Sequence, residues 1–304
     1  MKKTVLLSYL ALLLALGLPF VRTARAASAE PETLAVLTPE GVAAMAAEDY
    51  LVGVVAAEMS ASFPEEALKA QAVAARTYAL YCARSDKHGE AAVCTDPGCC
   101  QAWQSDAQLR DKWGESYGTN LARIRAAVEA TAGQYLSWEG LPAFAAFHAS
   151  SAGATEDSGA IWSALPYLVS VSSPETAGEV PNYVSTVSCL PLDFRDTLLS
   201  ARPEADFTGE PESWLGPVER DGSGRTATVE LGGALFSGTE LRALFRLRST
   251  AFTLEYKEGV FTFTVTGSGH GVGMSQYGAK VLAETGSDYA AILAHYYPGT
   301  QLVS

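Results

Sequence analysis

Glu58 is the residue best placed for acid–base chemistry, because it is a carboxylic acid within an apolar stretch. It follows V-V-A-A near the end of residues 46–59, a segment of helical composition. Burial raises the pKa of a carboxyl group toward the range in which it works as a general acid. Arg76 lies eighteen residues later in an equally apolar segment. A structural ion pair of Glu58 with Arg76, between two packed antiparallel helices, is the second interpretation.

A glycine-rich stretch follows a predicted strand near the end of the chain. Residues 268–278 read S-G-H-G-V-G-M-S-Q-Y-G, and their polar side chains include His270, Ser275, Gln276 and Tyr277. The stretch matches neither the phosphate-binding pattern G-x-x-x-x-G-K-[ST] nor a dinucleotide-binding βαβ fingerprint. We expect a strand-to-helix turn whose glycines let the backbone approach a ligand closely.

Two further clusters carry reactive residue types. H-A-S-S-A-G at 148–153 combines a histidine with two serines, which is typical of a hydrolase or of a serine-rich loop with a hydrogen-bonded histidine. His88, Cys94, Cys99 and Cys100 fall within thirteen residues. Zinc accepts such a mixture, but a disulfide from Cys94 to Cys99 or Cys100 is the equally open alternative. A vicinal Cys99–Cys100 bond would be strained.

The first residues predict export. Lys2 and Lys3 precede an apolar run, Val5–Val21, and Ala24 and Ala26 have the spacing of a cleavage site. We therefore expect residues 1–26 to be a signal peptide that directs the chain to the outer face of the membrane or the cell wall. An uncleaved anchor is the alternative.

Charge narrows the classes of partner. The chain of 304 residues has a formal net charge of −13, and residues 1–26 contribute basic residues only. So acidic a protein repels nucleic acid, whereas a neutral polymer such as a glycan meets no such penalty. Hydrophobic residues make up 48% of the chain, which is enough for a sizeable core.

Periodicity and turn residues predict an α+β fold. We expect a helical N-terminal part packed on an antiparallel β-rich part at about 190–266, with a substrate groove between them. The expected helices are 46–59, 64–84, 119–132, 238–246, 274–285 and 287–297. The expected strands are 34–37, hairpins turning at Glu139–Gly140 and at Lys257–Gly259, and a β region from Pro217. Residues 85–118 and 150–180 read as irregular.

Several segments together resemble the stage II sporulation protein D family. They cover nearly all of the chain after the signal peptide, so residues 27–304 are identified as one catalytic domain of that family. The motifs are the long segment at 48–79 that contains A-A-E-M, C-C-Q-A-W at 99–103, F-H-A-S-S-A-G at 147–153, I-W-S-A-L-P-Y-L at 161–168, V-S-S-P at 171–174, G-H-G-V-G-M-S-Q-Y-G-A at 269–279 and H-Y-Y-P-G-T at 295–300.

The resemblance implies lytic transglycosylase action on peptidoglycan, with Glu58 as the single general acid and base. The bond cut would be the β-1,4 link from N-acetylmuramic acid to N-acetylglucosamine, leaving a 1,6-anhydro end. It also implies that the preferred substrate is glycan whose stem peptides a partner amidase has removed, during engulfment of the forespore. The implied partners are that amidase and other engulfment proteins. The residues that would position sugars or support Glu58 are Arg76, Ser151, His270, Ser275, Gln276 and Tyr277.

The resemblance further implies a structural zinc held by His88, Cys94 and Cys100, with Cys99 as a fourth or substitute ligand. Ala149 departs from the family's H-S-T-S-G-G pattern and removes a hydroxyl there. Two alternatives stay open: a catalytically idle protein that binds peptidoglycan as a scaffold, and a zinc hydrolase with an open metal site beside a base.

Overall fold

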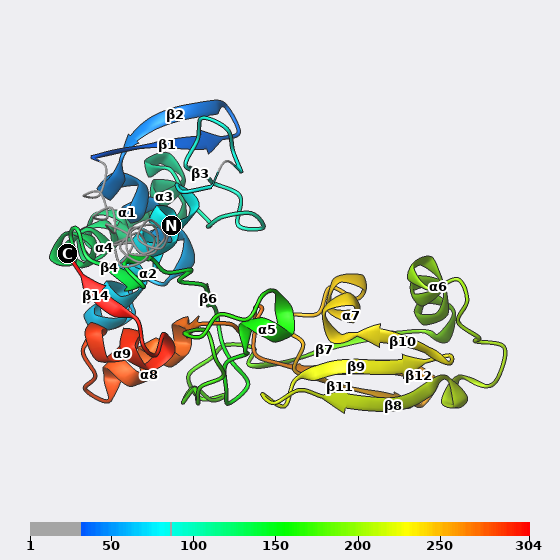
Figure 1. The fold of residues 1–304 in the computed structure, drawn as a ribbon. Coiled ribbons are helices and arrows are strands. Elements are labelled where there is room, and N and C mark those ends of the chain that lie inside the picture. Colours follow the sequence, from blue (N-terminus) through cyan, green and yellow to red (C-terminus); the bar gives the residue numbers. More distant parts are fainter. Residues whose placement is uncertain (1–31, 86) are drawn as a thin grey trace, which may run out of the picture.

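A computed structural model describes residues 32–85 and 87–304 of the chain (Figure 1). The predicted signal peptide, 1–26, lies outside the described residues. The α+β class is confirmed: helices gather at one end of the molecule, and a β-rich part projects from them. Among the described residues, no helix combines the length and the apolar character needed to cross a bilayer.

The chain enters through a hairpin and two helices, of which the sequence predicts the two helices and the first strand but not the second strand. Strands β1 (Thr33–Thr38) and β2 (Gly41–Ala46) pair antiparallel, and β3 (Val93–Cys94) joins β1 in parallel. Helix α1 (Ala47–Glu58) ends in a short turn, and α2 (Glu65–Cys82) starts after Pro64. Proline suits the start of a helix, and the glutamates that follow it suit the positive end of the helix dipole.

Helix α2 is the centre of the helical part because its alanines allow close approach from all sides. Ala67, Ala70 and Ala74 are fully buried. The helices that contact α2 are α1, α4 (Tyr117–Ala130), α8 (Gln276–Glu284) and α9 (Tyr289–Tyr296). The end of the chain therefore returns to its beginning and completes the helical part.

Short strands and turns link the helices to the pocket described below. The hairpin of β4 (Tyr135–Trp138) and β5 (Leu141–Pro142) turns at Glu139–Gly140 as predicted, and β14 (Gln301–Val303) pairs with β4. Strand β6 (Phe147–His148) pairs in parallel with β13 (Met274–Ser275), which leads into α8. Residues 150–180 are irregular apart from α5 (Ser158–Ile161).

The β-rich part has a hydrophobic core of its own. Phe194 stacks on Phe261 with ring centroids 3.9 Å apart, and Phe263 and Phe236 are fully buried beside them. One sheet is β10-β9-β8 and the other is β11-β12-β7. Its elements are β7 (Val184–Cys189), α6 (Pro191–Ala201), η2 (Pro211–Trp214), β8 (Leu215–Arg220), β9 (Thr226–Leu231), β10 (Ala234–Ser237), α7 (Gly238–Leu244), β11 (Phe252–Lys257) and β12 (Val260–Thr266).

The structure adds several elements that the sequence did not predict. Helix α3 (Asp106–Trp113), followed by η1 (Gly114–Ser116), interrupts the expected irregular region. A capping box at its start, with Ser105 and Gln108 exchanging hydrogen bonds, is a readable signal for this helix. β7 and α6 lie before the predicted β region, and β7 pairs with β12 in the same sheet.

Gly53 in α1 marks a close packing contact that positions the segment after the cysteines. A Cβ atom there would lie 2.6 Å from Trp103 Cδ1 and 2.8 Å from the Gln104 carbonyl oxygen. Gly118 in α4, by contrast, has open space around it. An alanine normally stabilises a helix relative to glycine by about 1 kcal/mol.

We predict opposite effects for alanine at these two positions. Gly118→Ala will stabilise the protein by roughly 0.5–1 kcal/mol, whereas Gly53→Ala will destabilise it by about 1–3 kcal/mol because the added carbon displaces Trp103. Chemical denaturation measures both values. Equal stabilisation by the two variants would contradict the packing described here.

Candidate active site

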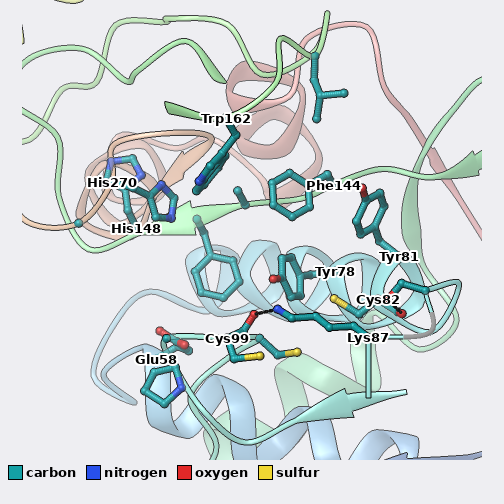
Figure 2. Close-up of a pocket in the computed structure, with 18 of the residues that line it drawn as sticks. Glu58, Tyr78, Tyr81, Cys82, Lys87, Cys99, Phe144, His148, Trp162 and His270 are labelled. Carbon is teal, nitrogen blue, oxygen red and sulfur yellow. Dashed lines mark hydrogen bonds between the residues drawn. The ribbon is translucent and has the colours of Figure 1, made fainter. Parts of the chain in front are cut away.

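A pocket of about 770 Å³ lies between the helical part and the loops that face it (Figure 2). Glu58, Cys99 and Lys87 are on one side of it, and Trp162, His148 and His270 are on the other. The lining residues are Glu58, Tyr78, Tyr81, Cys82, Ser85, Lys87, Pro97, Gly98, Cys99, Cys100, Phe144, Ala146, Phe147, His148, Trp162, Ser163, Leu165, Arg242, Gly269 and His270.

Glu58 is the last residue of α1, and its carboxyl group faces the pocket. Its Oε1 accepts a hydrogen bond from the Ala102 backbone N–H at 2.8 Å. Burial raises the pKa of Glu58, and the bond from Ala102 and the nearby amide of Gln276 oppose that rise. The end of a helix carries partial negative charge, which disfavours a carboxylate further. The net result is a pKa above the ordinary value of a glutamate, which brings the group closer to the range of a general acid.

Arg76 does not meet Glu58. Helices α1 and α2 run antiparallel on either side of the turn at 59–64, so residues equally far from the turn face each other. Arg76 is about three turns along α2 and faces Glu48, whose Oε1 accepts from its Nη2 at 2.9 Å. Its Nη1 donates to the Gln134 carbonyl at 3.3 Å. The predicted pair with Glu58 is wrong, and Arg76 is fully buried away from the pocket lining.

His270 does line the pocket. Its ring centroid lies 5.0 Å from that of Trp162 and 5.7 Å from that of His148. Burial, with the charge of Arg242, lowers the pKa of His270 to about 4. The imidazole is therefore neutral near pH 7, and its Nδ1 accepts from the Val272 backbone N–H at 3.1 Å. A neutral ring held in this way suits a positioning group better than a proton donor.

His148, which lines the pocket, forms a buried hydrogen-bonded pair with Ser151. His148 Nδ1 lies 3.2 Å from the Val272 carbonyl and must donate to it, so Nε2 accepts from the Ser151 hydroxyl at 2.7 Å. Burial holds the pKa of His148 well below its ordinary value. Ser151 is fully buried and does not line the pocket. The interpretation as a serine-rich loop with a hydrogen-bonded histidine is confirmed, and the pair cannot reach a substrate as a hydrolase dyad.

The other residues predicted from the glycine-rich stretch do not line the pocket and instead contact residues around it. Ser275 caps α8, and its hydroxyl donates to Glu175. Gln276 begins α8 beside Glu58, and Tyr277 packs edge-on against Phe63 at 5.1 Å between ring centroids. None of the three is among the pocket-lining residues.

The glycines of this stretch mostly permit contact with the protein itself. A Cβ at Gly273, where φ is +70°, would collide with the Ala146 carbonyl oxygen, because β13 runs closely beside β6. At Gly269, φ is +109° and a Cβ would lie 2.7 Å from His148 Cβ. Gly269 is the one glycine of the stretch that also lines the pocket. The predicted close approach to a ligand is therefore limited to this end of the loop.

The cysteine region forms a compact cluster at the pocket's edge. The ligand atoms of His88, Cys94, Cys99 and Cys100 all lie within 4.8 Å of one another. His88 Nε2 is 3.2 Å from Cys100 Sγ and 3.6 Å from Cys99 Sγ. All the cysteines of the described residues are free thiols. Three thiols and one imidazole converging on one point match the donor set and number of a tetrahedral zinc site.

Aromatic side chains make up much of the pocket wall, and sequence reasoning missed them. Tyr81 and Trp162 are 41% and 48% exposed, which is unusual for rings of this size outside a binding surface. Phe144 lies between them, 5.1 Å and 5.5 Å away by ring centroids. Tyr78 and Phe147 complete the wall. Trp162 and Phe147 lie within recognisable motifs, but no local signal indicates that these rings converge.

Sequence reasoning also passed over a serine in the nucleophile pattern G-x-S-x-G, at 114–118. Ser116 ends η1 between helices α3 and α4 and lies outside the pocket lining. A nucleophile elbow needs a strand-to-helix turn, which is not present there. The match has no structural support.

Comparison with known proteins identifies the family to which this chain is similar. The family model described as "Stage II sporulation protein" matches residues 39–138, which include Glu58 and the cysteine cluster. Stage II sporulation protein D of Bacillus amyloliquefaciens is 38% identical over 259 residues, which is 84% of this chain and 73% of that protein. The Bacillus subtilis protein of the same name is 37% identical over 84% of this chain and 74% of its own length. The amidase enhancer of B. subtilis is 30% identical over 84% of this chain, which spans 40% of that longer protein.

The raised pKa of Glu58 predicts a pH-dependent gain of stability on substitution. The folded state holds this proton more tightly than the unfolded chain, so the wild type loses stability as the pH rises from below the ordinary pKa of 4.5 through the raised value. We expect Glu58→Gln to be more stable relative to the wild type at pH 7 than at pH 4. Thermal unfolding at both pH values measures the difference.

Glu65→Gln is the matched control. A hydrogen bond from Lys69 lowers the pKa of this exposed carboxyl, so its small contribution is present at pH 7 and is lost in acid. Its substitution should therefore shift stability in the opposite direction. If the stability difference between Glu58→Gln and the wild type is the same at both pH values, the carboxyl group of Glu58 is not desolvated in the folded state.

Proposed function

The chain belongs to the stage II sporulation protein D family, and from this premise we propose that it is a peptidoglycan lytic transglycosylase. Family membership and the amidase enhancer relative support a sporulation-related role at the cell wall. The finer proposal is cleavage of the β-1,4 bond between N-acetylmuramic acid and N-acetylglucosamine. The observation that carries it is Glu58, the one carboxylic acid among the pocket-lining residues, with its pKa raised.

One carboxylic acid is enough for this reaction. Glu58 donates its proton to the glycosidic oxygen as the bond from that oxygen to C1 of the muramic sugar breaks. The resulting carboxylate then takes the proton of the sugar's own C6 hydroxyl as O6 forms its bond to C1. The products are an N-acetylglucosamine end and a 1,6-anhydro end, and the acid is regenerated. A retaining hydrolase would need a second carboxylate about 5 Å away, and the described pocket lining contains none.

The rest of the pocket suits a saccharide. Exposed aromatic faces offer an apolar surface for sugar rings, and polar groups at the edges fix orientation. The Ala102 N–H holds the Glu58 carboxyl in place. Neutral His148 and His270 lie opposite it. The backbone amide that favours the carboxylate and the burial that disfavours it are both needed, because the group must give up a proton and then accept one.

For the cysteine cluster we propose a structural zinc, held by His88, Cys94 and Cys100 with Cys99 as the fourth ligand. Zinc bound there would fix the loop at 94–102, and Ala102, at the end of that loop, donates to Glu58. Four ligands from the chain leave no open position for an activated water. That is the reason for preferring a structural role to a zinc hydrolase.

The proposed setting follows from the family. We propose export of the chain, glycan strands as its substrate, and cooperation with a cell-wall amidase and other engulfment proteins. The name of one relative, amidase enhancer, supports the link to an amidase.

We predict that Glu58→Gln abolishes cleavage while the fold stays intact. The amide has the size of the acid but cannot supply or accept the proton, so the rate should fall by at least a factor of about 10²–10⁴. Digestion of purified glycan strands, with mass spectrometry of the ends, measures it. Circular dichroism shows whether the variant folds. Wild-type rates from this variant would remove Glu58 from the mechanism.

We also predict one zinc ion per chain. Cys94→Ser should lose the metal and lower the melting temperature, because it removes a ligand from a buried position. Cys189→Ser is the control, since Cys189 lies in β7 of the β-rich part. Elemental analysis and thermal unfolding measure both effects. Loss of cleavage on chelation with no change in melting temperature would mean that the zinc is catalytic.

A further inference from the structure

The charge of the pocket is opposite to that of the protein. The chain is strongly acidic, yet its pocket lining contains two permanent cations, Lys87 and Arg242, and a single carboxyl group, Glu58. Burial raises the pKa of Glu58, which reduces its negative charge, and His148 and His270 are neutral near pH 7. The pocket is therefore prepared for a ligand that carries negative charge.

Of the two cations, Lys87 is already engaged. Its Nζ donates to the Cys99 carbonyl oxygen at 3.0 Å (Figure 2). It lies beside the cysteine cluster, whose thiolates would need a nearby positive charge once they bind a metal. The charge of Lys87 therefore interacts with the cysteine cluster at this edge of the pocket.

Arg242 is the cation that remains for a ligand. It belongs to α7, and it is the one pocket-lining residue from the β-rich part. Its Nε donates to the Leu247 carbonyl at 3.3 Å, and it forms no ion pair within residues 32–85 and 87–304. Its charge lowers the pKa of both His148 and His270, and these two histidines lie across the pocket from Lys87 (Figure 2). A half-buried guanidinium with its fork uncommitted is suited to bind a carboxylate with two hydrogen bonds.

We propose that Arg242 binds the free lactyl carboxylate of N-acetylmuramic acid and thereby selects glycan without stem peptides; this inference rests on the proposed function. In intact peptidoglycan the lactyl carboxyl is an amide bond to the peptide and carries no charge. Hydrolysis of that amide leaves a carboxylate on every second sugar. Only the hydrolysed strand can form the charge-assisted pair with Arg242.

Binding measured without cleavage tests the proposal. All variants carry Glu58→Gln, and the probes are stripped glycan strands and the same strands with their lactyl carboxyls capped as methylamides. Arg242→Gln should weaken binding to the free-carboxylate strands roughly 10- to 100-fold and leave binding to the capped strands unchanged. Arg242→Lys should bind the free-carboxylate strands with an affinity between that of the protein with Arg242 and that of Arg242→Gln. The reason is that an ammonium group keeps the charge but cannot form two parallel hydrogen bonds.

Arg246→Gln is the matched control, because it removes the same charge from an exposed position four residues further on. It should leave both affinities unchanged. Equal weakening toward free and capped strands by Arg242→Gln would assign Arg242 a structural role and overturn the proposal. Because binding is measured separately from cleavage, a wild type that cleaves neither strand would contradict the proposed function without deciding this inference.

Discussion

The site depends on keeping one carboxyl group away from water at the end of α1. The pKa of Glu58 is raised because the α1–α2 pair, the loop after the cysteines and the start of α8 together shield its carboxyl group from much of the solvent. These elements come from the beginning, the middle and the end of the chain. Their convergence on α2 explains why that helix is so rich in alanine, since larger side chains would hold the neighbouring helices apart.

The opposite wall is held by a second buried carboxyl group with a different role. Glu175 is 2% exposed, yet it accepts hydrogen bonds from the Ser151 backbone N–H at 2.6 Å, from the Ser173 hydroxyl at 2.6 Å and from Ser275. These bonds tie the His148 loop and the start of α8 to one carboxyl group. Glu58, by contrast, accepts from one backbone donor and faces the pocket.

Signals within short segments of the sequence predicted those helices and strands whose formation depends on neighbouring residues. The proline and glutamates before α2 and the alternation in β12 indicated their elements, and Glu58 stood out as a charge in an apolar helix. The partner of Arg76 could not be predicted from spacing, because the register of two packed helices decides it. The aromatic wall was also missed, since Tyr78, Phe144 and Trp162 come from separate segments. The cysteine cluster was predicted because its members are close in sequence, and the structure places the ligand atom of Cys99 within 4.8 Å of those of the other three.

The central claim is that Glu58 directs the sugar's own hydroxyl, and not water, to the anomeric carbon. Digestion of glycan strands in water enriched in oxygen-18, followed by mass spectrometry of the new muramic ends, tests it directly. The account predicts 1,6-anhydro ends without oxygen-18, because O6 supplies the new bond. Reducing ends that each carry one oxygen-18 atom would show that water attacks, and they would contradict the single-carboxyl mechanism.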